Sequence, residues 1–261
     1  MFDKPILKKL IIPPGIILGV LFSAPSYETR PVHTYSIVAY DESSGELGVA
    51  VQSHWFSVGF LVPWARSGVG AVATQSFVKV DYGPDGLRLM EEGLTAREAL
   101  EKLISEDDGE AVRQVAMIDV KGNVATHTGS KCIYAAGHQI GKNYSVQANL
   151  MEKETVWPAM AKAFENTEGD LADRMMAALE AAEAEGGDIR GKQSAAMLIV
   201  TGTPTGVPWK DVVMDIRVDD HPEPLKELKR LIRIQRAYLH ANKGDHYLET
   251  DEIEKALVEY E

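Results

Sequence analysis

The clearest strand pattern in the chain is His33-Thr34-Tyr35-Ser36-Ile37-Val38-Ala39-Tyr40-Asp41, in which polar and apolar residues alternate. Such alternation is typical of a β-strand with one buried face. An acidic turn, Asp41 to Gly45, follows this strand, and the apolar run Leu47 to Val51 comes soon after the turn. The stretch therefore predicts a β-hairpin with Thr34 at the head of its first strand.

The composition limits the classes of function. The chain has 261 residues, enough for one large domain or two small ones, and a formal net charge of −12. This charge argues against a nucleic-acid partner, because phosphates require a basic surface. Cys132 is the single cysteine, so an internal disulfide and a cysteine-based zinc cluster are excluded.

Residues 1–33 differ in character from the rest of the chain. A lysine-rich start, an apolar run from Leu10 to Leu21 and small residues up to Ser26 resemble a secretory signal peptide. The run is shorter than the roughly 20 residues that span a bilayer, and Pro13 and Pro14 disfavour a helix, so no stable membrane span is expected. The alternative is a disordered extension, and localisation stays open between the cytoplasm and export.

From Thr34 to Pro222 the pattern predicts one α+β domain. Several strands precede the first helix, and strands and helices then alternate in blocks, which favours antiparallel sheets. Further predicted strands are 47–51, 56–64, 68–75, 113–120, 123–128, 143–150, 194–201 and 212–218. Predicted helices are 87–92, one that starts at Thr95, 154–168 and 170–185. We expect two antiparallel sheets between helix layers, a four-layer αββα sandwich with its tryptophans, including Trp209, mainly in the core.

Residues 223–261 are predicted to form a helical tail. Gly244-Asp245 followed by an Ala-Leu-x-x-Tyr helix resembles one tetratricopeptide-type helix pair. A single pair cannot form a solenoid, because such repeats need neighbours. The tail is therefore expected to pack on its own domain or on a second subunit, and we expect a homo-oligomer.

Several separated motifs together resemble a known family. They are Thr34 to Asp41, Gly48 to Gly59, Val62 to Ala65, Gly68 to Ser76, Tyr82 to Pro84, His127 to Gly129, Ser145 to Asn149, Gly186 to Ser194 and Arg217 to Pro222. Between Thr34 and about Leu231 the chain resembles domain of unknown function 1028, a family placed among the N-terminal-nucleophile (Ntn) hydrolases. The resemblance implies an αββα sandwich whose first strand begins with the nucleophile.

That resemblance makes Thr34 the candidate nucleophile. A hydroxyl needs an adjacent base at neutral pH, and an α-amine with an ordinary pKa of about 7.7–8.0 can serve as that base. Thr34 has a free α-amine only if the bond from His33 is cut. The alternative is an ordinary strand residue, because threonine favours strands.

Four further residues at predicted strand ends are catalytic candidates. Ser53 could orient the amine across the hairpin. Backbone N–H groups of Gln75 and Ser76, and the side-chain amide of Asn149, could form an oxyanion hole, which needs fixed donors aimed at developing charge. Each could equally be a plain strand end.

Three residues are candidates for substrate binding. Arg190 could hold a substrate carboxylate through two parallel hydrogen bonds, with Asp188 and His54 beside it. Alternatively, Asp188 and Arg190 form a structural salt bridge, and His54 is a surface histidine.

Two other clusters are weaker candidates. Cys132 lies near His127 in the sequence, but a buried structural thiol is the commoner case. Asp219-Asp220-His221 has the composition of a metal site, yet its position before Pro222 fits a turn, so no metal and no cofactor are expected.

Together these features predict an Ntn-type amidohydrolase that acts on a small amide or peptide. The alternative is a non-catalytic small-ligand-binding or scaffold protein on the same fold.

Overall fold

The computed structural model describes residues 34–260. They form two antiparallel β-sheets and six α-helices, which confirms the predicted α+β class with two antiparallel sheets. The signal-like extension predicted for residues 1–33 lies outside the described residues. Within residues 34–260, no helix combines the length and the apolar character needed to cross a membrane.

The larger sheet is built around the strand that opens the domain. Its strands are β1 (Thr34–Tyr40), β2 (Leu47–Ser53), β7 (Gly137–Gly141), β8 (Tyr144–Asn149), β9 (Ser194–Val200) and β10 (Val212–Val218). Their order is β10-β9-β2-β1-β8-β7. The predicted hairpin of β1 and β2 is confirmed, and it lies in the centre of this sheet.

The smaller sheet faces the larger one. It consists of β3 (Pro63–Arg66), β4 (Gly70–Ser76), β5 (Arg113–Asp119) and β6 (Val124–Thr128), in that order. Apolar residues of β1, β2 and β9 pack against those of β4 and β5 in a core between the two sheets. The small residues that the sequence places in β4 allow the sheets to approach closely.

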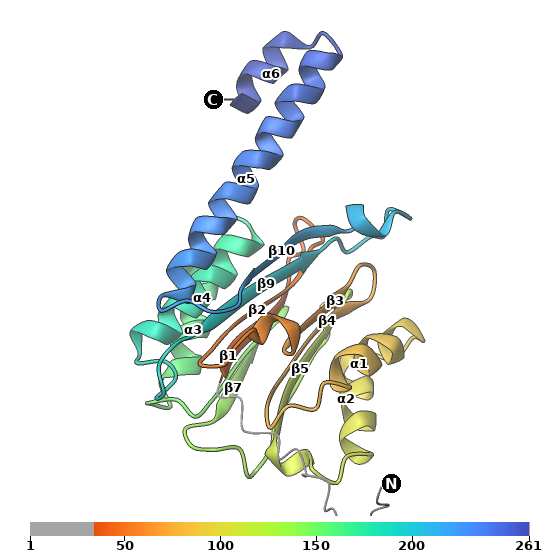
Figure 1. The fold of residues 1–261 in the computed structure, drawn as a ribbon. Helices are drawn as coiled ribbons and strands as arrows, with labels where there is room; N and C mark the ends of the chain where they lie inside the picture. The colour runs from red at the N-terminus through yellow and green to blue at the C-terminus, as the bar shows by residue number, and fades with distance from the viewer. Residues whose placement is uncertain (1–33, 261) are drawn as a thin grey trace, which may run out of the picture.

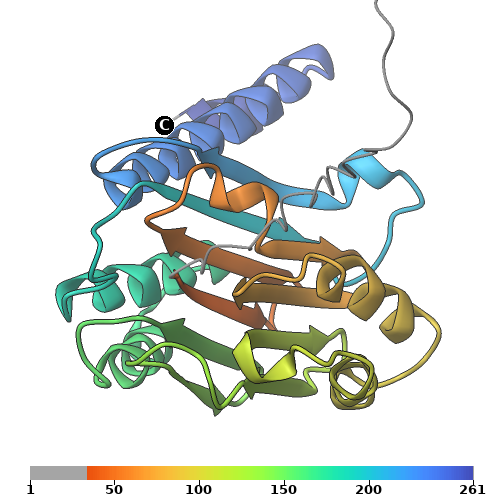
Figure 2. The ribbon, with the colours of Figure 1, turned by 60° about the horizontal axis from the view of Figure 1, so that its bottom comes forward.

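Helices lie on the outer face of each sheet (Figure 1). They are α1 (Tyr82–Glu91), α2 (Ala96–Ser105), α3 (Val156–Asn166) and α4 (Leu171–Ala184). The first two pack on the smaller sheet, and the other two pack on the larger sheet, each pair with its own apolar core. Figure 2 turns the lower end of the sheets toward the reader.

Alternation along β1 sends its side chains into two different layers. Tyr35 and Ile37 pack with α3 and α4, whereas Val38 belongs to the core between the sheets. Because residues two apart on a strand share a face, Thr34 and Ser36 also point between the sheets. The strand pattern thus places Thr34 in an interior layer rather than on the surface.

Four local predictions differ from the structure. α1 begins at Tyr82, five residues before the predicted helix 87–92. Residues 56–64 form a short 3₁₀ helix, η1 (Val58–Phe60), followed by β3, instead of one strand. β7 was not predicted, because Ile140 is its only large aliphatic residue and that side chain is exposed, so the strand lacks an apolar alternation. Trp209 is 78% exposed rather than in the core.

The tail forms a helical hairpin that extends from the body (Figure 1). Its helices are α5 (Pro224–Glu249) and α6 (Ile253–Tyr260). Gly244 lies inside α5, and a Cβ atom there would sit 2.6 Å from the ring of Tyr260. The glycine therefore allows α6 to fold back closely against α5.

Candidate functional site

A row of buried polar residues crosses the larger sheet at the end where β1 begins. Thr34 lies opposite Ser53 on β2 and opposite Asn149 on β8. Ser53 in turn lies opposite Ser194 on β9. All four are buried. The antiparallel register therefore brings three of the predicted catalytic residues side by side.

Thr34 is held by hydrogen bonds from three directions. Its Oγ1 donates to Oγ of Ser53 at 3.0 Å. Its carbonyl oxygen accepts from Nε2 of Gln75 at 3.2 Å and from Nδ2 of Asn149 at 3.4 Å. Gln75 comes from the smaller sheet, so Thr34 is anchored to both sheets.

Two glutamines and a serine that were not predicted as site residues complete this network. Gln114 on β5 accepts from Nε2 of Gln75 at 2.7 Å and from Nδ2 of Asn149 at 3.0 Å. Ser36 donates to Oε1 of Gln75 at 2.6 Å, and Gln147 donates to Oγ of Ser36 at 2.6 Å. We call Thr34, Ser36, Ser53, Gln75, Gln114, Gln147 and Asn149 the polar layer.

The polar layer leaves one amide oxygen without a partner. Oδ1 of Asn149 is buried and accepts no hydrogen bond within residues 34–260. An unpaired buried polar atom costs about 1–3 kcal/mol, so such atoms call for a functional or structural explanation. The atom belongs to a residue that directly faces Thr34 in the sheet.

Strained backbone follows two of the strands that contribute to the polar layer. Ser76, directly after Gln75, has φ of 71°, and Leu150, directly after Asn149, has φ of 54°. The left-handed region costs non-glycine residues on the order of 1–3 kcal/mol, and such residues concentrate at functional sites. Each of these two residues directly follows a residue of the polar layer, so the strained backbone marks the edge of that layer.

Ser76 itself faces away from Thr34. Its hydroxyl lies beside the Cys132 thiol, whose pKa is raised by burial and lowered to a smaller extent by that hydroxyl. The thiol donates to the carbonyl oxygen of Arg113 at 3.2 Å. His127 instead contacts Glu110 at 3.0 Å, so the structure does not join Cys132 and His127 as a nucleophile and its base.

The three predicted substrate-binding residues form a cluster beside Ser53. Oδ2 of Asp188 accepts from the backbone N–H of His54 at 3.1 Å and from Nη2 of Arg190 at 3.0 Å. The Asp188 side chain is fully buried, whereas that of Arg190 is 28% exposed. The ion pair matches the structural alternative for these residues, and it also fixes the loop next to the polar layer.

His138 is a titratable group at the edge of the polar layer. Its Nδ1 lies 2.8 Å from Oγ1 of Thr128, which in turn accepts from Nε2 of Gln114 at 3.0 Å. Burial lowers the pKa of His138, and the nearby His127 lowers it further. His138 therefore favours its neutral form near neutral pH.

Asp219-Asp220-His221 form a turn held by side-chain contacts with residues distant in the sequence. Asp219 accepts from Oγ of Ser57 at 2.7 Å, and Asp220 accepts from Nε2 of Gln193 at 3.1 Å. Within residues 34–260, no group of three or more potential metal-ligating side chains is found.

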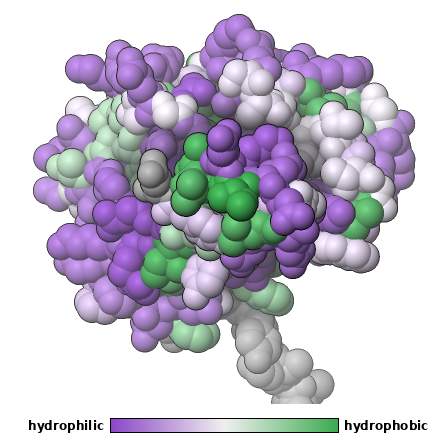
Figure 3. Space-filling view, turned by 90° about the horizontal axis from the view of Figure 1, so that it is seen from above, coloured by the Kyte–Doolittle hydropathy of each residue, from purple (hydrophilic) through white to green (hydrophobic). Residues whose placement is uncertain are grey.

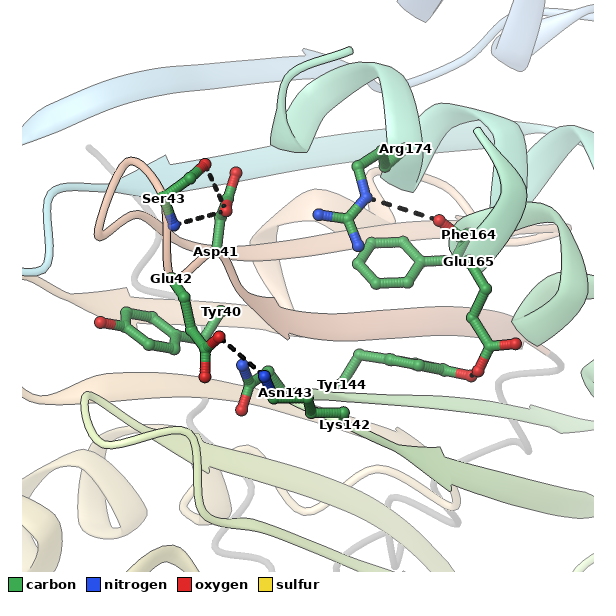
Figure 4. A pocket seen from close by; sticks show the side chains of 10 residues that line it. All are labelled: Tyr40, Asp41, Glu42, Ser43, Lys142, Asn143, Tyr144, Phe164, Glu165 and Arg174. Carbon is green, nitrogen blue, oxygen red and sulfur yellow. Dashed lines mark hydrogen bonds and ion pairs between the residues drawn. The ribbon is translucent and has the colours of Figure 1, made fainter. Parts of the chain in front are cut away.

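A separate pocket lies at the other end of β1 (Figure 4). Its volume is about 380 Å³, and it is lined by Tyr40, Asp41, Glu42, Ser43, Lys142, Asn143, Tyr144, Phe164, Glu165 and Arg174. The Arg174 guanidinium stacks 4.2 Å from the centre of the Phe164 ring. Thr34 and this pocket stand six residues apart on one strand, about 20 Å, so the pocket is not part of the polar layer.

The comparisons with known proteins place the chain in a family. A model described as "Family of unknown function (DUF1028)" matches residues 34–228. The chain belongs to this family. The crystal structure of protein SPO2555 from Silicibacter pomeroyi, also assigned to DUF1028, is similar, with 29% sequence identity and a TM-score of 0.69. That match covers 77% of this chain and 88% of the other.

The family assignment carries no activity with it. No curated protein matches the chain. The description of DUF1028 names no reaction, and neither does the name of the related structure. Because the DUF1028 match ends at residue 228, most of α5 and all of α6 lie beyond the family region.

Proposed function

We propose that this DUF1028 protein is an Ntn-type amidohydrolase, with an Ntn-hydrolase αββα sandwich and Thr34 as nucleophile after removal of residues 1–33. One observation carries the proposal: Thr34 is the first residue of a central strand, and its hydroxyl lies 3.0 Å from Ser53 inside a layer of uncharged polar side chains. The substrate would be a small amide or peptide.

The environment suits a freed α-amine as general base. Burial disfavours the charged form of an amine and lowers its pKa from the ordinary value of about 7.7–8.0. The side chains of the polar layer are hydroxyls and amides, which carry no charge that would oppose this shift. Asp188, the acidic member of the adjacent cluster, is neutralised by Arg190. The amine would therefore be a neutral base near pH 7.

Side-chain amides fix the position of Thr34. Nδ2 of Asn149 and Nε2 of Gln75 lie within 3.4 Å of the Thr34 carbonyl oxygen, so the proposed nucleophile is held between the two sheets. To serve as an oxyanion donor, the Asn149 amide would turn from this carbonyl oxygen toward the substrate. The freed amine of Thr34 would also offer N–H donors near Oδ1 of Asn149, which accepts no hydrogen bond within residues 34–260.

The loop that carries Asp188 and Arg190 would form the substrate side of the site. It joins the start of β9 and is tied to His54 at the end of β2, one residue beyond Ser53. The exposed part of the Arg190 guanidinium could receive a carboxylate of a peptide substrate. Ser76 would contribute through its backbone N–H, because its hydroxyl is directed toward Cys132.

The test begins with the N-terminus of the mature chain. Mass spectrometry should find a chain that begins at Thr34, and a fusion cut directly before Thr34 should supply the same species. This species should hydrolyse members of a panel of chromogenic amides and dipeptides, Thr34→Ser should retain part of the rate, and Thr34→Ala should be inactive but folded. A fully active Thr34→Ala, or an active chain that still carries residues before Thr34, would refute the proposal.

The second candidate is a non-catalytic binding or scaffold protein. The observation in its favour is that Thr34 is completely buried and both its hydroxyl and its carbonyl oxygen are hydrogen-bonded, as in a structural residue. In that case the bond between His33 and Thr34 stays intact in the mature protein. Thr34→Ala would then lower stability and leave ligand retention unchanged.

A further inference from the structure

The hairpin of α5 and α6 is anchored to the body at one end only. Leu225, Leu228 and Ile232 of α5 are buried in the core that covers the larger sheet. Gln235 and Arg236 still contact the body, and after Arg236 α5 continues to Glu249, which at 1.5 Å per residue is about 20 Å of helix beyond the body. We call residues 224–260 the arm.

The arm exposes a concentration of large apolar side chains. Tyr238, Leu239, Leu248, Ile253, Leu257 and Val258 are each between 49% and 75% exposed. Figure 3, which looks down on this end of the molecule, shows apolar groups at its centre bordered by polar ones. Scattered apolar residues are normal on a surface, but so many large ones on a short projecting hairpin indicate an interaction site.

The short helix of the arm packs against α5, and this contact leaves its large apolar side chains exposed. α6 has eight residues, and isolated helices of that length are unstable in water. In α6, Ala256 is the buried residue. A groove of about 400 Å³ between the two helices is lined by Ala237, His240, Ala241, Val258, Glu259 and Tyr260. The two small alanines leave room for side chains of another helix.

The charges of the arm identify its partner. Its first part, residues 224–243, has six basic residues (Lys226, Lys229, Arg230, Arg233, Arg236 and Lys243) and one acid, a net charge of +5. Its second part, residues 244–260, has six acids (Asp245, Glu249, Asp251, Glu252, Glu254 and Glu259) and one lysine, a net charge of −5. We call these parts the base and the tip.

Some of these charges are already paired within the chain. Lys229 contacts Glu180, Arg230 contacts Glu227, and Arg236 contacts Asp170 and Asp173. Lys226 contacts Glu223, Lys243 contacts Glu259, and Lys255 contacts Glu252. Among residues 34–260, Arg233 of the base and Glu249, Asp251 and Glu254 of the tip form no ion pair, so opposite charges remain available at opposite ends of the arm.

We propose that the arms of two copies of this chain pack antiparallel about a two-fold axis, with the tip of one beside the base of the other. Two hairpins then form a four-helix arrangement that buries the exposed apolar residues of both. Apolar burial supplies the affinity, and Arg233 of one base, opposite the unpaired Glu249, Asp251 and Glu254 of the other tip, sets the direction. A parallel arrangement would bring like charges together, and the acidic tip opposes binding to an anionic membrane.

The first experiment measures assembly of the full chain by sedimentation velocity between 1 and 100 μM. A dimer is expected, and Leu257→Glu with Val258→Glu should weaken it by about 100-fold or more, because each substitution acts twice in a two-fold interface. Trp209→Ser, which alters an equally exposed side chain outside the arm, should leave the dissociation constant unchanged. Circular dichroism should show that all variants are folded.

The second experiment tests the direction of packing. Arg233→Glu and Glu249→Lys should each weaken the dimer by about 2–5-fold, as expected for exposed charges, whereas the double variant should recover to within about 2-fold of the original. A monomer at 100 μM, a dimer indifferent to the paired glutamates, or a double variant weaker than either single one would overturn the proposal. Pelleting of the protein with neutral phosphatidylcholine vesicles, lost in the glutamate variant, would also overturn it in favour of a lipid surface.

Discussion

Gln114, which was not predicted as a site residue, connects the two sheets as directly as the predicted Gln75 does. Its Oε1 accepts from Gln75 and Asn149, and its Nε2 donates to the carbonyl oxygen of Ala148 at 2.9 Å and of Gly137 at 3.2 Å. A glutamine can do this because its amide has two donors and an acceptor with two lone pairs. Side-chain amides therefore satisfy the interior without buried charge.

We predict that Gln114→Leu destabilises the protein by about 2–5 kcal/mol, because it leaves several buried donors and acceptors unpaired. Urea unfolding followed by tryptophan fluorescence measures the change. Gln235→Leu is the matched control, because Gln235 is partly buried and donates a single bond, to the carbonyl oxygen of Val213 at 2.8 Å. Equal losses for the two variants would contradict the central role of Gln114.

Asp107 provides a pH-dependent contribution to stability. Burial raises the pKa of this carboxyl, but hydrogen bonds and charge from Arg113, with the Gly109 N–H, outweigh it and lower the pKa to about 2. The unfolded value is about 3.9, so the contribution is fully present above that pH and is lost as the pH falls toward 2.

We therefore predict that Asp107→Asn lowers the free energy of unfolding by about 2 kcal/mol at pH 6. The difference between the two proteins should shrink between pH 4 and pH 2 as the aspartate gains its proton. Urea titrations at several pH values measure this difference. Asp85→Asn, at an exposed carboxylate on α1, should give no comparable trend, and a gap that widens on acidification would contradict the assignment.

At the level of elements, local sequence determines where a helix begins or ends, and contacts with distant residues determine how the helix packs. α2 begins directly after Thr95, as predicted, with a capping box in which Thr95 accepts from the Glu98 N–H and Glu98 accepts from the Thr95 N–H. In contrast, α5 runs through Gly244 because Tyr260 of α6 packs against that position. Glycine often ends a helix, but Gly244 lies within α5 and allows α6 to pack closely against it.

We predict that Gly244→Leu displaces α6 and leaves the sheets intact. The new Cβ would lie 2.6 Å from the Tyr260 ring, which is well inside van der Waals contact. Amide hydrogen exchange should accelerate in residues 253–260 by at least about tenfold, with little change in β1. Asn242→Leu, at an exposed position of the same helix, is the control, and unchanged exchange in α6 for Gly244→Leu would show that the packing is different.

On the scale of the whole molecule, the body and the arm are distinct in how they are stabilised. The body has three apolar cores and the polar layer, and the DUF1028 match lies within it and the first residues of α5. The arm is attached through its first turns and carries its apolar residues outward. Stability of the body should therefore be independent of the distal arm.

We predict that deletion of residues 237–261 changes the melting temperature of the body by less than about 3 °C, since Ile232 is the last residue of α5 that is buried in the core of the body. Differential scanning calorimetry measures this value at a low protein concentration, where dimerisation does not contribute. Deletion of residues 224–261 also removes Leu225, Leu228 and Ile232, and it should lower the melting temperature by much more. A large loss for the shorter deletion would place further stabilising contacts in the distal arm.

Much of the fold follows from local sequence. The alternation from Thr34 to Tyr40, the acidic turn and the next apolar run predicted the central hairpin, because backbone geometry links a period of two to a strand. The apolar faces of residues 154–185 likewise predicted α3 and α4. β7 was missed because a strand at a sheet edge with few apolar residues carries no such period.

The sequence by itself determined the class of fold, the family and the position of Thr34 at the head of the central strand. Only the tertiary structure assembled the polar layer, in which Gln75, Gln114 and Gln147 come from three strands of two sheets. A glutamine inside a strand has no local signal for its partner, because that partner is set by the register and by the face-to-face packing of the sheets. The direction of the arm likewise depends on tertiary contacts. The first turns of α5 are buried in the core over the larger sheet, and the later turns pack against no core.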